Sequence, residues 1–101
     1  MKNSRWILSR KAVSDIEEIW LYTLEKWSLE QADRYYNLIF DEIEYVCKNS
    51  NAGKSIEHIR NGYRVTKVKS HLIFYRMSDK GIIEVIRILH ERMDIENRIN
   101  D

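Results

Sequence analysis

The chain has 101 residues, of which 44% are hydrophobic and 11% aromatic, so we expect residues 1–101 to form one domain with one modest core. Its formal net charge is +1 and its pI is about 7.9, values that do not suggest a strongly basic nucleic-acid-binding protein. A single cysteine, Cys47, excludes an intrachain disulfide and a cysteine-rich metal site. No apolar run approaches the roughly 20 residues of a membrane span. We therefore expect a cytoplasmic protein without metal or cofactor.

The first half of the chain predicts a short strand followed by two helices. Residues 6–8 are apolar and favour a strand, and Ser9 follows as a helix N-cap. Apolar residues then recur at spacings of three and four up to Trp27, and Ser28 opens a capping box that begins a second helix. That helix ends in the turn-forming residues 49–53. Because the connection is so short, we expect an antiparallel helical hairpin.

The second half predicts three strands, at residues 63–68, 71–77 and 82–89, all rich in β-branched and aromatic residues. Short polar connections between them suit hairpin turns, which gives an antiparallel meander. In the last strand apolar residues occupy both parities, so the strand is covered on both faces or carries a bulge. Apolar residues on both parities of the middle strand also suggest that a second molecule covers part of the outer sheet face.

The helical hairpin has one apolar side, which must cover one face of the sheet. This predicts a two-layer α+β domain of order β-α-α-β-β-β, with the hairpin packed on an antiparallel sheet. Four aromatic residues lie at helical spacing, and we expect them to be core residues. They are Trp20, Trp27, Tyr35 and Tyr36.

A polar cluster follows the last predicted strand and contains the strongest candidate functional residues. It includes Arg87, His90 and Arg92, and His90 could exchange a proton near neutral pH. Alternatively, Arg87 points outward from its strand or pairs with Glu84. Eight basic and three acidic residues lie between positions 60 and 92. Such a surface would attract an acidic partner or a phosphate backbone, although a solvated strand face has the same composition.

A series of short motifs also runs through the chain in a fixed order. In the first half they are Ile7-Leu8-Ser9, Ala12, Asp15-Ile16, Ile19-Trp20, Tyr22, Trp27, Gln31-Ala32 and Tyr35. In the second half they are Gly53, Ile59-Arg60, Gly62-Tyr63-Arg64, His71, Ile73-Phe74-Tyr75-Arg76, Arg87-Ile88-Leu89-His90 and Arg92-Met93-Asp94. Together they resemble the RelE/ParE superfamily of bacterial toxins, and its ParE, or plasmid-stabilisation, branch in particular. One departure is the missing proline that many relatives carry before Gly53, which alters a loop.

The resemblance implies one of two mechanisms. RelE-like proteins cut messenger RNA on the ribosome, whereas ParE-like proteins poison DNA gyrase without hydrolysing a bond. Ribonucleolysis needs a base, an acid and cations for the transition state, which His90, Arg76, Arg87 and Lys67 could supply. However, Leu72 stands where RelE-like chains often place a catalytic arginine, and Glu91 replaces the tyrosine that several of them carry after the histidine.

These departures favour the ParE-like mechanism. We therefore expect a type II toxin that inhibits gyrase by protein binding, is not an enzyme, and is neutralised by a ParD-like antitoxin; no direct nucleic-acid specificity is expected. The alternatives are a ribosome-dependent endoribonuclease and a detoxified protein that only binds its antitoxin. Five residues are predicted to contact the target or the antitoxin, and none is predicted to be catalytic. They are Arg64, Arg76, Arg87, His90 and Arg92.

Overall fold

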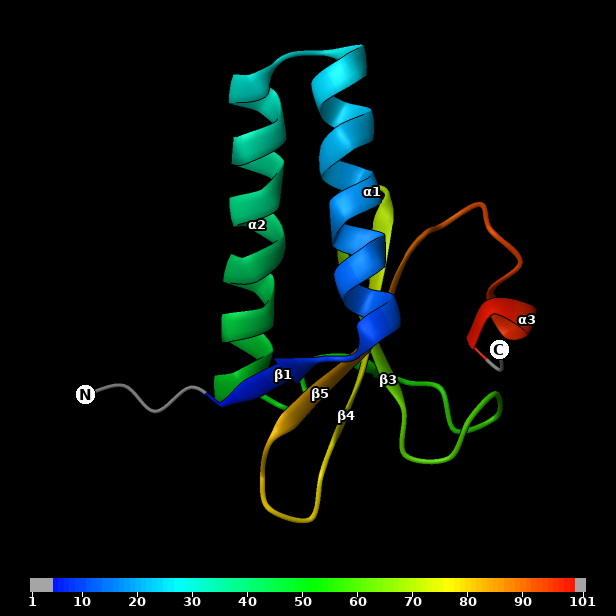
Figure 1. Cartoon of the computed structure of the whole chain (residues 1–101). Helices are drawn as coiled ribbons and strands as arrows, with labels where there is room; N and C mark the ends of the chain where they lie inside the picture. Colours follow the sequence, from blue (N-terminus) through cyan, green and yellow to red (C-terminus); the bar gives the residue numbers. More distant parts are fainter. Residues whose placement is uncertain (1–4, 100–101) are drawn as a thin grey trace.

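The computed structural model describes residues 5–99 and has two layers, a helical hairpin and a sheet (Figure 1). The hairpin covers one face of the sheet, and its tip extends beyond the ends of the strands. The predicted α+β fold and the order of its main elements are confirmed. The elements are β1 (Trp6–Leu8), α1 (Arg10–Lys26), α2 (Leu29–Lys48), β2 (Lys54–Ser55), β3 (Arg64–Val68), β4 (His71–Met77), β5 (Ile83–His90) and α3 (Ile95–Ile99).

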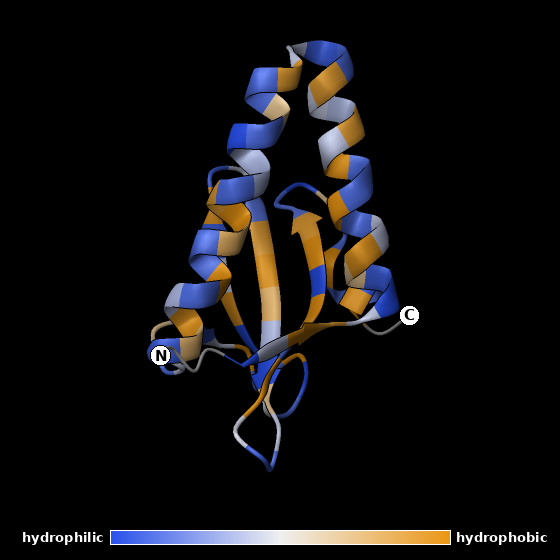
Figure 2. Cartoon of the chain, turned by 60° about the vertical axis from the view of Figure 1, so that its left-hand side comes forward, coloured by the Kyte–Doolittle hydropathy of each residue, from blue (hydrophilic) through white to orange (hydrophobic). Residues whose placement is uncertain are grey.

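Both long helices begin at the predicted serine caps. The hydroxyl of Ser9 accepts a hydrogen bond from the backbone N–H of Ala12, and that of Ser28 accepts one from the N–H of Gln31, each at 3.0 Å. Apolar and hydrophilic residues alternate along the hairpin as far as its tip, while long apolar stretches run through the strands (Figure 2). Among the described helices, none has the length and hydrophobicity of a membrane span.

The sheet has the strand order β1-β5-β4-β3-β2. Strands β3, β4 and β5 form the predicted antiparallel meander, and β2 adds a short antiparallel edge. In contrast, β1 pairs with β5 in parallel, so the sheet is not antiparallel throughout. Apolar alternation sets which face of a strand is buried but does not set the direction of its partner, which explains why the sequence did not reveal this parallel edge.

A β-bulge in β5 explains why apolar residues occupy both parities of that strand. Phe74 of β4 pairs with Arg87, and the next residue of β4 pairs with Val85, which leaves Ile86 without a register partner in β4. Because of the extra residue, the side chains that face the helices change from odd-numbered positions, such as Val85, to even-numbered ones, such as Ile88. The predicted bulge is therefore present, and β5 is also covered on both faces.

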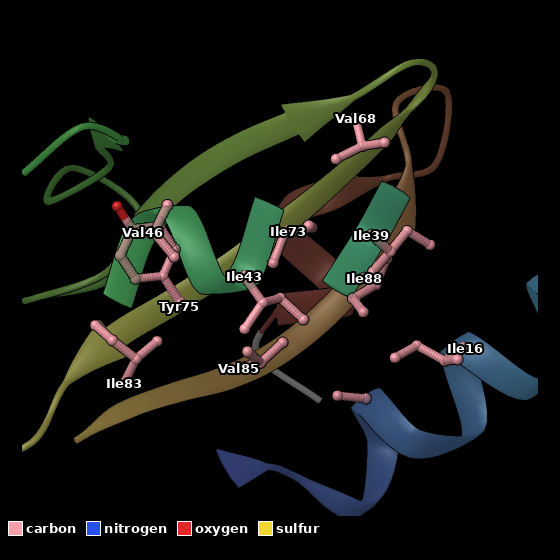
Figure 3. Close-up of a cluster of buried hydrophobic side chains, with 11 residues drawn as sticks. Ile16, Ile39, Ile43, Val46, Val68, Ile73, Tyr75, Ile83, Val85 and Ile88 are labelled. Atoms are coloured by element: carbon pink, nitrogen blue, oxygen red, sulfur yellow. The ribbon is translucent and has the colours of Figure 1, made fainter. Parts of the chain in front are cut away.

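The main core lies between the helical hairpin and the sheet (Figure 3). A second core lies on the outer sheet face, where residues 56–63 and α3 fold back over β4 and β5. The chain itself thus covers the surface for which a second molecule was expected, and that expectation is wrong. Buried residues of the main core are Ala12, Ile16, Ile39, Ile43, Val46, Val68, Ile73, Tyr75, Ile83, Val85 and Ile88, and those of the second core are Ile56, Phe74, Leu89 and Ile99.

Candidate functional site

A groove of about 980 Å³ lies between α1, the start of α2 and the ends of the central strands. Aromatic and imidazole rings line much of it, and we call it the aromatic groove. Its size and apolar walls suit a segment of another protein chain. Its lining residues are Asp15, Glu18, Ile19, Tyr22, Thr23, Trp27, Gln31, Tyr35, Lys69, Ser70, His71, Ile88, His90 and Met93.

Two histidines on paired strands lie on the floor of the aromatic groove. His71 of β4 is the register partner of His90 of β5, and their rings meet edge to face with centroids 5.3 Å apart. Tyr35 donates its hydroxyl proton to the carbonyl of Val68 at 2.9 Å, so the 2.7 Å contact between Tyr35 and Nδ1 of His71 requires the histidine to donate. Neutral His71 therefore keeps its lone pair on Nε2.

Hydrogen bonding also fixes the proton of the second imidazole. The backbone N–H of Arg92 donates to Nδ1 of His90 at 3.1 Å, so neutral His90 carries its proton on Nε2. Burial lowers the pKa of His71, and the neighbouring His90 lowers it further. Burial raises the pKa of Tyr35. At neutral pH the floor of the groove therefore carries a neutral His71 imidazole beside an un-ionised phenol.

Several aromatic side chains of the hairpin are exposed. Trp27 is 73% exposed and Tyr36 is 43% exposed, so the prediction that these two residues belong to the core is wrong. Tyr22 on the neighbouring turn is also exposed. For Trp27 the reason is geometric, because this residue follows α1 at the tip, where the hairpin extends beyond the sheet and has no strand to cover (Figure 1). This leaves an apolar surface that is available to a partner.

Arg87 is a structural residue. Its Nε and Nη2 each donate to a different carboxylate oxygen of Asp15 at 2.9 Å, and both residues are 9% exposed. Its Nη1 donates to the backbone carbonyl of Arg98 in α3 at 3.1 Å. The predictions that Arg87 points outward or pairs with Glu84 are both wrong, because the Arg87 guanidinium is buried and binds Asp15 of α1 across the edge of β5. A guanidinium engaged in this way is poorly placed to contact a partner.

Asp15 also completes the edge of β5. Strand β1 pairs only with residues 83–85, and past this point side chains take the place of a neighbouring strand. The Ser9 hydroxyl donates to the carbonyl of Ile86 at 2.7 Å, and Asp15 accepts the N–H of Ile88 at 2.9 Å. In the sequence Asp15 stood out only as part of the Asp15-Ile16 motif, and neither its burial nor its pairing with Arg87 was predicted, although its position three residues after Ala12 places it beside the apolar stripe of α1.

The other predicted contact residues do not form one site. Arg64 donates to the carbonyls of Gly53 and Asn51 and so anchors the loop after α2. Arg76, near the same end of the sheet, forms an ion pair with Glu84. These two arginines lie at the opposite ends of β3 and β4 from His90, and Arg92 follows the end of β5. Only His90 of the five predicted residues lines the aromatic groove.

Charged side chains near the ends of the central strands are paired within the chain. Among residues 5–99, no group of three or more histidine, cysteine, aspartate or glutamate residues is placed to hold a metal ion. Lys67 forms an ion pair with Glu91, which holds the pKa of that carboxyl below its usual value. The arrangement is therefore that of a binding surface beside a set of internally paired charges.

Comparisons with known proteins agree with this fold. Toxin ParE1 of Mycobacterium tuberculosis strain H37Rv is 37% identical over 97 residues, covering 96% of this chain and 99% of the relative. Toxin ParE1 of Caulobacter vibrioides is 37% identical over 87 residues (86% and 88%), and Toxin ParE of Escherichia coli is 27% identical over 96 residues (95% and 93%). A chain of a solved structure described as the chromosomal ParDE TA system from P. aeruginosa has a TM-score of 0.74 and 21% identity, covering 85% of this chain and 94% of that one.

The family assignment rests on these relatives together with a match along most of the chain. The sequence profile described as "ParE toxin of type II toxin-antitoxin system, parDE" matches residues 6–95. This range includes both long helices, every strand of the sheet and the whole aromatic groove. The predicted resemblance to the ParE branch is therefore confirmed, and the chain belongs to the ParE toxin family of type II toxin–antitoxin systems.

Proposed function

We propose that this toxin inhibits DNA gyrase by binding to it, without cleaving a substrate, and that a ParD-like antitoxin produced in the same cytoplasm neutralises it. Membership of the ParE family supports the gyrase target. The pairing of the basic side chains with carboxylates of the same chain is the observation in this structure that favours a binding toxin over a ribonuclease.

The three cations that a ribonuclease mechanism would use each have a carboxylate partner within the chain. Arg76 Nε lies 2.6 Å from Glu84 Oε1, Lys67 Nζ lies 2.8 Å from Glu91 Oε1, and Arg87 binds Asp15. A cation stabilises a transition state best when its charge is directed at the reacting group and not already neutralised. These pairs therefore weaken the ribonuclease alternative, because each of the three cations is already engaged and Arg76 lies at the opposite end of β4 from His90.

We place the antitoxin in the aromatic groove. The apolar groove, with exposed Tyr22 and Trp27 at its upper end, suits the apolar face of an amphipathic helix that folds on binding. Large aromatic side chains at the centre of an interface commonly carry much of the binding energy. The antitoxin would thus cover the surface that the hairpin leaves exposed beyond the sheet.

The mechanism is tested by assaying both candidate activities with one protein preparation. We expect the purified toxin to inhibit supercoiling of relaxed plasmid by gyrase, and to leave messenger RNA intact in a translation reaction. His90→Ala should retain the gyrase inhibition of the parent, because the proposed mechanism gives His90 no catalytic role and His90 lines the groove assigned to the antitoxin. Site-specific cleavage of translated messenger that His90→Ala abolishes would establish the ribonuclease instead. Expression without growth arrest would indicate a detoxified antitoxin-binding protein.

The antitoxin site is tested with a matched pair of aromatic substitutions. Tyr22 lines the aromatic groove and is 59% exposed, whereas Tyr45 is 52% exposed and lies outside it. We expect Tyr22→Ala to weaken antitoxin binding by about tenfold or more, and Tyr45→Ala to change it less than about twofold. Isothermal titration calorimetry with the antitoxin measures both. Equal effects of the two substitutions would place the antitoxin elsewhere.

A further inference from the structure

A second, smaller pocket lies at the beginning of α1, where this helix meets α3 and the loop of residues 56–63. It has a volume of about 340 Å³ and shares no lining residue with the aromatic groove. Five of its lining residues are basic and none of those described is acidic, so we call it the basic pocket. Four of these basic residues are exposed, whereas Arg87 is buried and paired with Asp15 and belongs to the wall of the pocket. The basic residues are Arg10, Lys11, Arg60, Arg87 and Arg98.

Hydrogen bonds and a cation–π contact fix the residues that form the walls of the basic pocket. Arg87 binds Asp15 on one side and the backbone carbonyl of Arg98 on the other, which ties α3 to β5 and α1. The guanidinium of Arg60 lies 5.5 Å from the centroid of the Tyr63 ring. Ser9, which caps α1, is fixed to the carbonyl of Ile86. The side chains of Arg10 and Arg98 are exposed around this frame.

The basic residues at the beginning of α1 differ from those that the N-terminus of a helix ordinarily favours. The N-terminus of a helix carries a partial positive charge and favours acidic residues, as Glu30 illustrates in the first turn of α2. The first turn of α1 has no acidic residue and begins with Arg10 and Lys11. Arg10 therefore lies beside the positive end of α1, and Arg98 of α3 lines the same pocket. Local conflicts of this kind are typical of binding sites.

We propose that the basic pocket binds a phosphate group of a DNA backbone, so that the toxin contacts the DNA held by its target as well as the target protein. This inference rests on the proposed gyrase function. Guanidinium groups match the oxygens of a phosphate, and a helix N-terminus adds backbone donors. A clustered positive charge also suits a chain of adjacent phosphates better than a single carboxylate. A contact with the phosphate backbone does not require recognition of the bases, which agrees with the expectation that the protein has no direct nucleic-acid specificity.

Binding to DNA alone tests the pocket without gyrase. We would titrate a fluorescein-labelled DNA duplex with the full-length toxin at several salt concentrations and follow fluorescence anisotropy. Arg10→Gln combined with Arg98→Gln removes two exposed cations from the pocket. Lys26→Gln combined with Lys80→Gln removes two exposed cations from elsewhere on the molecule and serves as the matched control.

We expect the pocket variant to weaken binding about tenfold or more at low salt. It should also reduce the slope of log K against log salt concentration by about 0.9 for each phosphate that the protein no longer neutralises. The control variant should stay within about twofold of the parent. Equal weakening by the two variants, or no duplex binding by the parent at low salt, would overturn the proposal. A thermal unfolding curve for each variant, expected to match the parent, separates loss of binding from loss of fold.

Two competitors distinguish the source of the anion. Unlabelled duplex should displace the labelled DNA, whereas ATP and poly-glutamate at equal charge concentration should not. Displacement by ATP as effective as that by duplex would identify a free-nucleotide site, and displacement by poly-glutamate would identify a site for an acidic protein; either result overturns the DNA assignment. Failure of the parent to inhibit gyrase would count against the proposed function alone, since duplex binding is measured without gyrase.

Discussion

The buried ion pair between Asp15 and Arg87 is predicted to be the largest single polar contribution to the stability of this fold. The carboxylate of Asp15 accepts three hydrogen bonds, two from the Arg87 guanidinium and one from the N–H of Ile88, all at 2.9 Å. Both charged residues are 9% exposed. Asp15→Asn keeps the shape of the side chain but removes the counter-charge, and one amide oxygen cannot replace two carboxylate oxygens.

Removing one partner of a buried ion pair costs about 3–5 kcal/mol, because the remaining charge stays buried without compensation. For a domain of this size, each kcal/mol lowers Tm by about 4–8 °C, so Asp15→Asn should lower Tm by roughly 12 °C or more. Arg76→Gln breaks the exposed pair with Glu84 and is the control. We expect it to cost less than about 1 kcal/mol. Urea denaturation followed by circular dichroism measures the free energy of unfolding for both variants.

A second substitution identifies the source of the destabilisation. Replacing Arg87 by Met in the Asp15→Asn background removes the uncompensated charge, so the double variant should recover part of the free energy of unfolding. If Asp15→Asn costs no more than Arg76→Gln, the ion pair contributes no more than a surface pair does. In that case the structural role of Arg87 is wrong, and Arg87 returns to the set of candidate contact residues.

Three further predictions concern the frame of the fold. Gly53→Ala should lower the free energy of unfolding by about 1–3 kcal/mol, because a Cβ at this position would collide with the Tyr75 hydroxyl that accepts the Gly53 N–H; chemical denaturation measures it. Ser28→Ala should cost about 1 kcal/mol through removal of the cap on Gln31, and a cost below about 0.5 kcal/mol would contradict the cap. The folded-state pKa of His71 lies below its ordinary value of 6.5, so the unfolded chain binds more protons as the pH falls. The contribution of His71 to the free energy of unfolding is therefore fully present above about pH 6.5 and is lost as the pH drops from 6.5 toward the lower pKa. Denaturation at pH 7.5 and 5.5 should show a smaller decrease in the free energy of unfolding for His71→Phe than for the parent.

The helices and turns could be predicted from the sequence because their signals are local. The caps at Ser9 and Ser28 act over three residues, and the connections of the meander are two and five residues long. The bulge in β5 was also visible as an interruption of alternation. Each of these features depends on residues that are near one another in the chain.

Features that depend on distant segments could not be predicted in the same way. The parallel pairing of β1 with β5 joins segments from the two halves of the chain. The cover of the outer sheet face comes from residues 56–63 and α3, which are too short to show a clear periodicity. Exposure of Trp27 depends on how far the hairpin extends beyond the sheet, and helical spacing carries no information on that distance.

The candidate site shows the same division. His90 was found because a polar residue at the end of an apolar strand is a recognisable pattern. The pairing of Arg87 with Asp15 was missed because it joins residues 72 positions apart across the free edge of β5. The basic pocket was missed because Arg10, Arg60 and Arg98 come from three separate segments, and the charge excess between positions 60 and 92 covers only one of them.

The central claim is that this toxin acts by holding gyrase and breaks no bond itself. Its most direct measurement is the amount of linear DNA recovered after detergent and protease treatment of gyrase, plasmid and purified toxin, with messenger RNA from a translation reaction analysed in parallel. We predict that toxin raises the linear fraction, that the antitoxin reverses this increase, and that messenger stays intact. Unchanged plasmid together with messenger cut at defined sites would contradict the account.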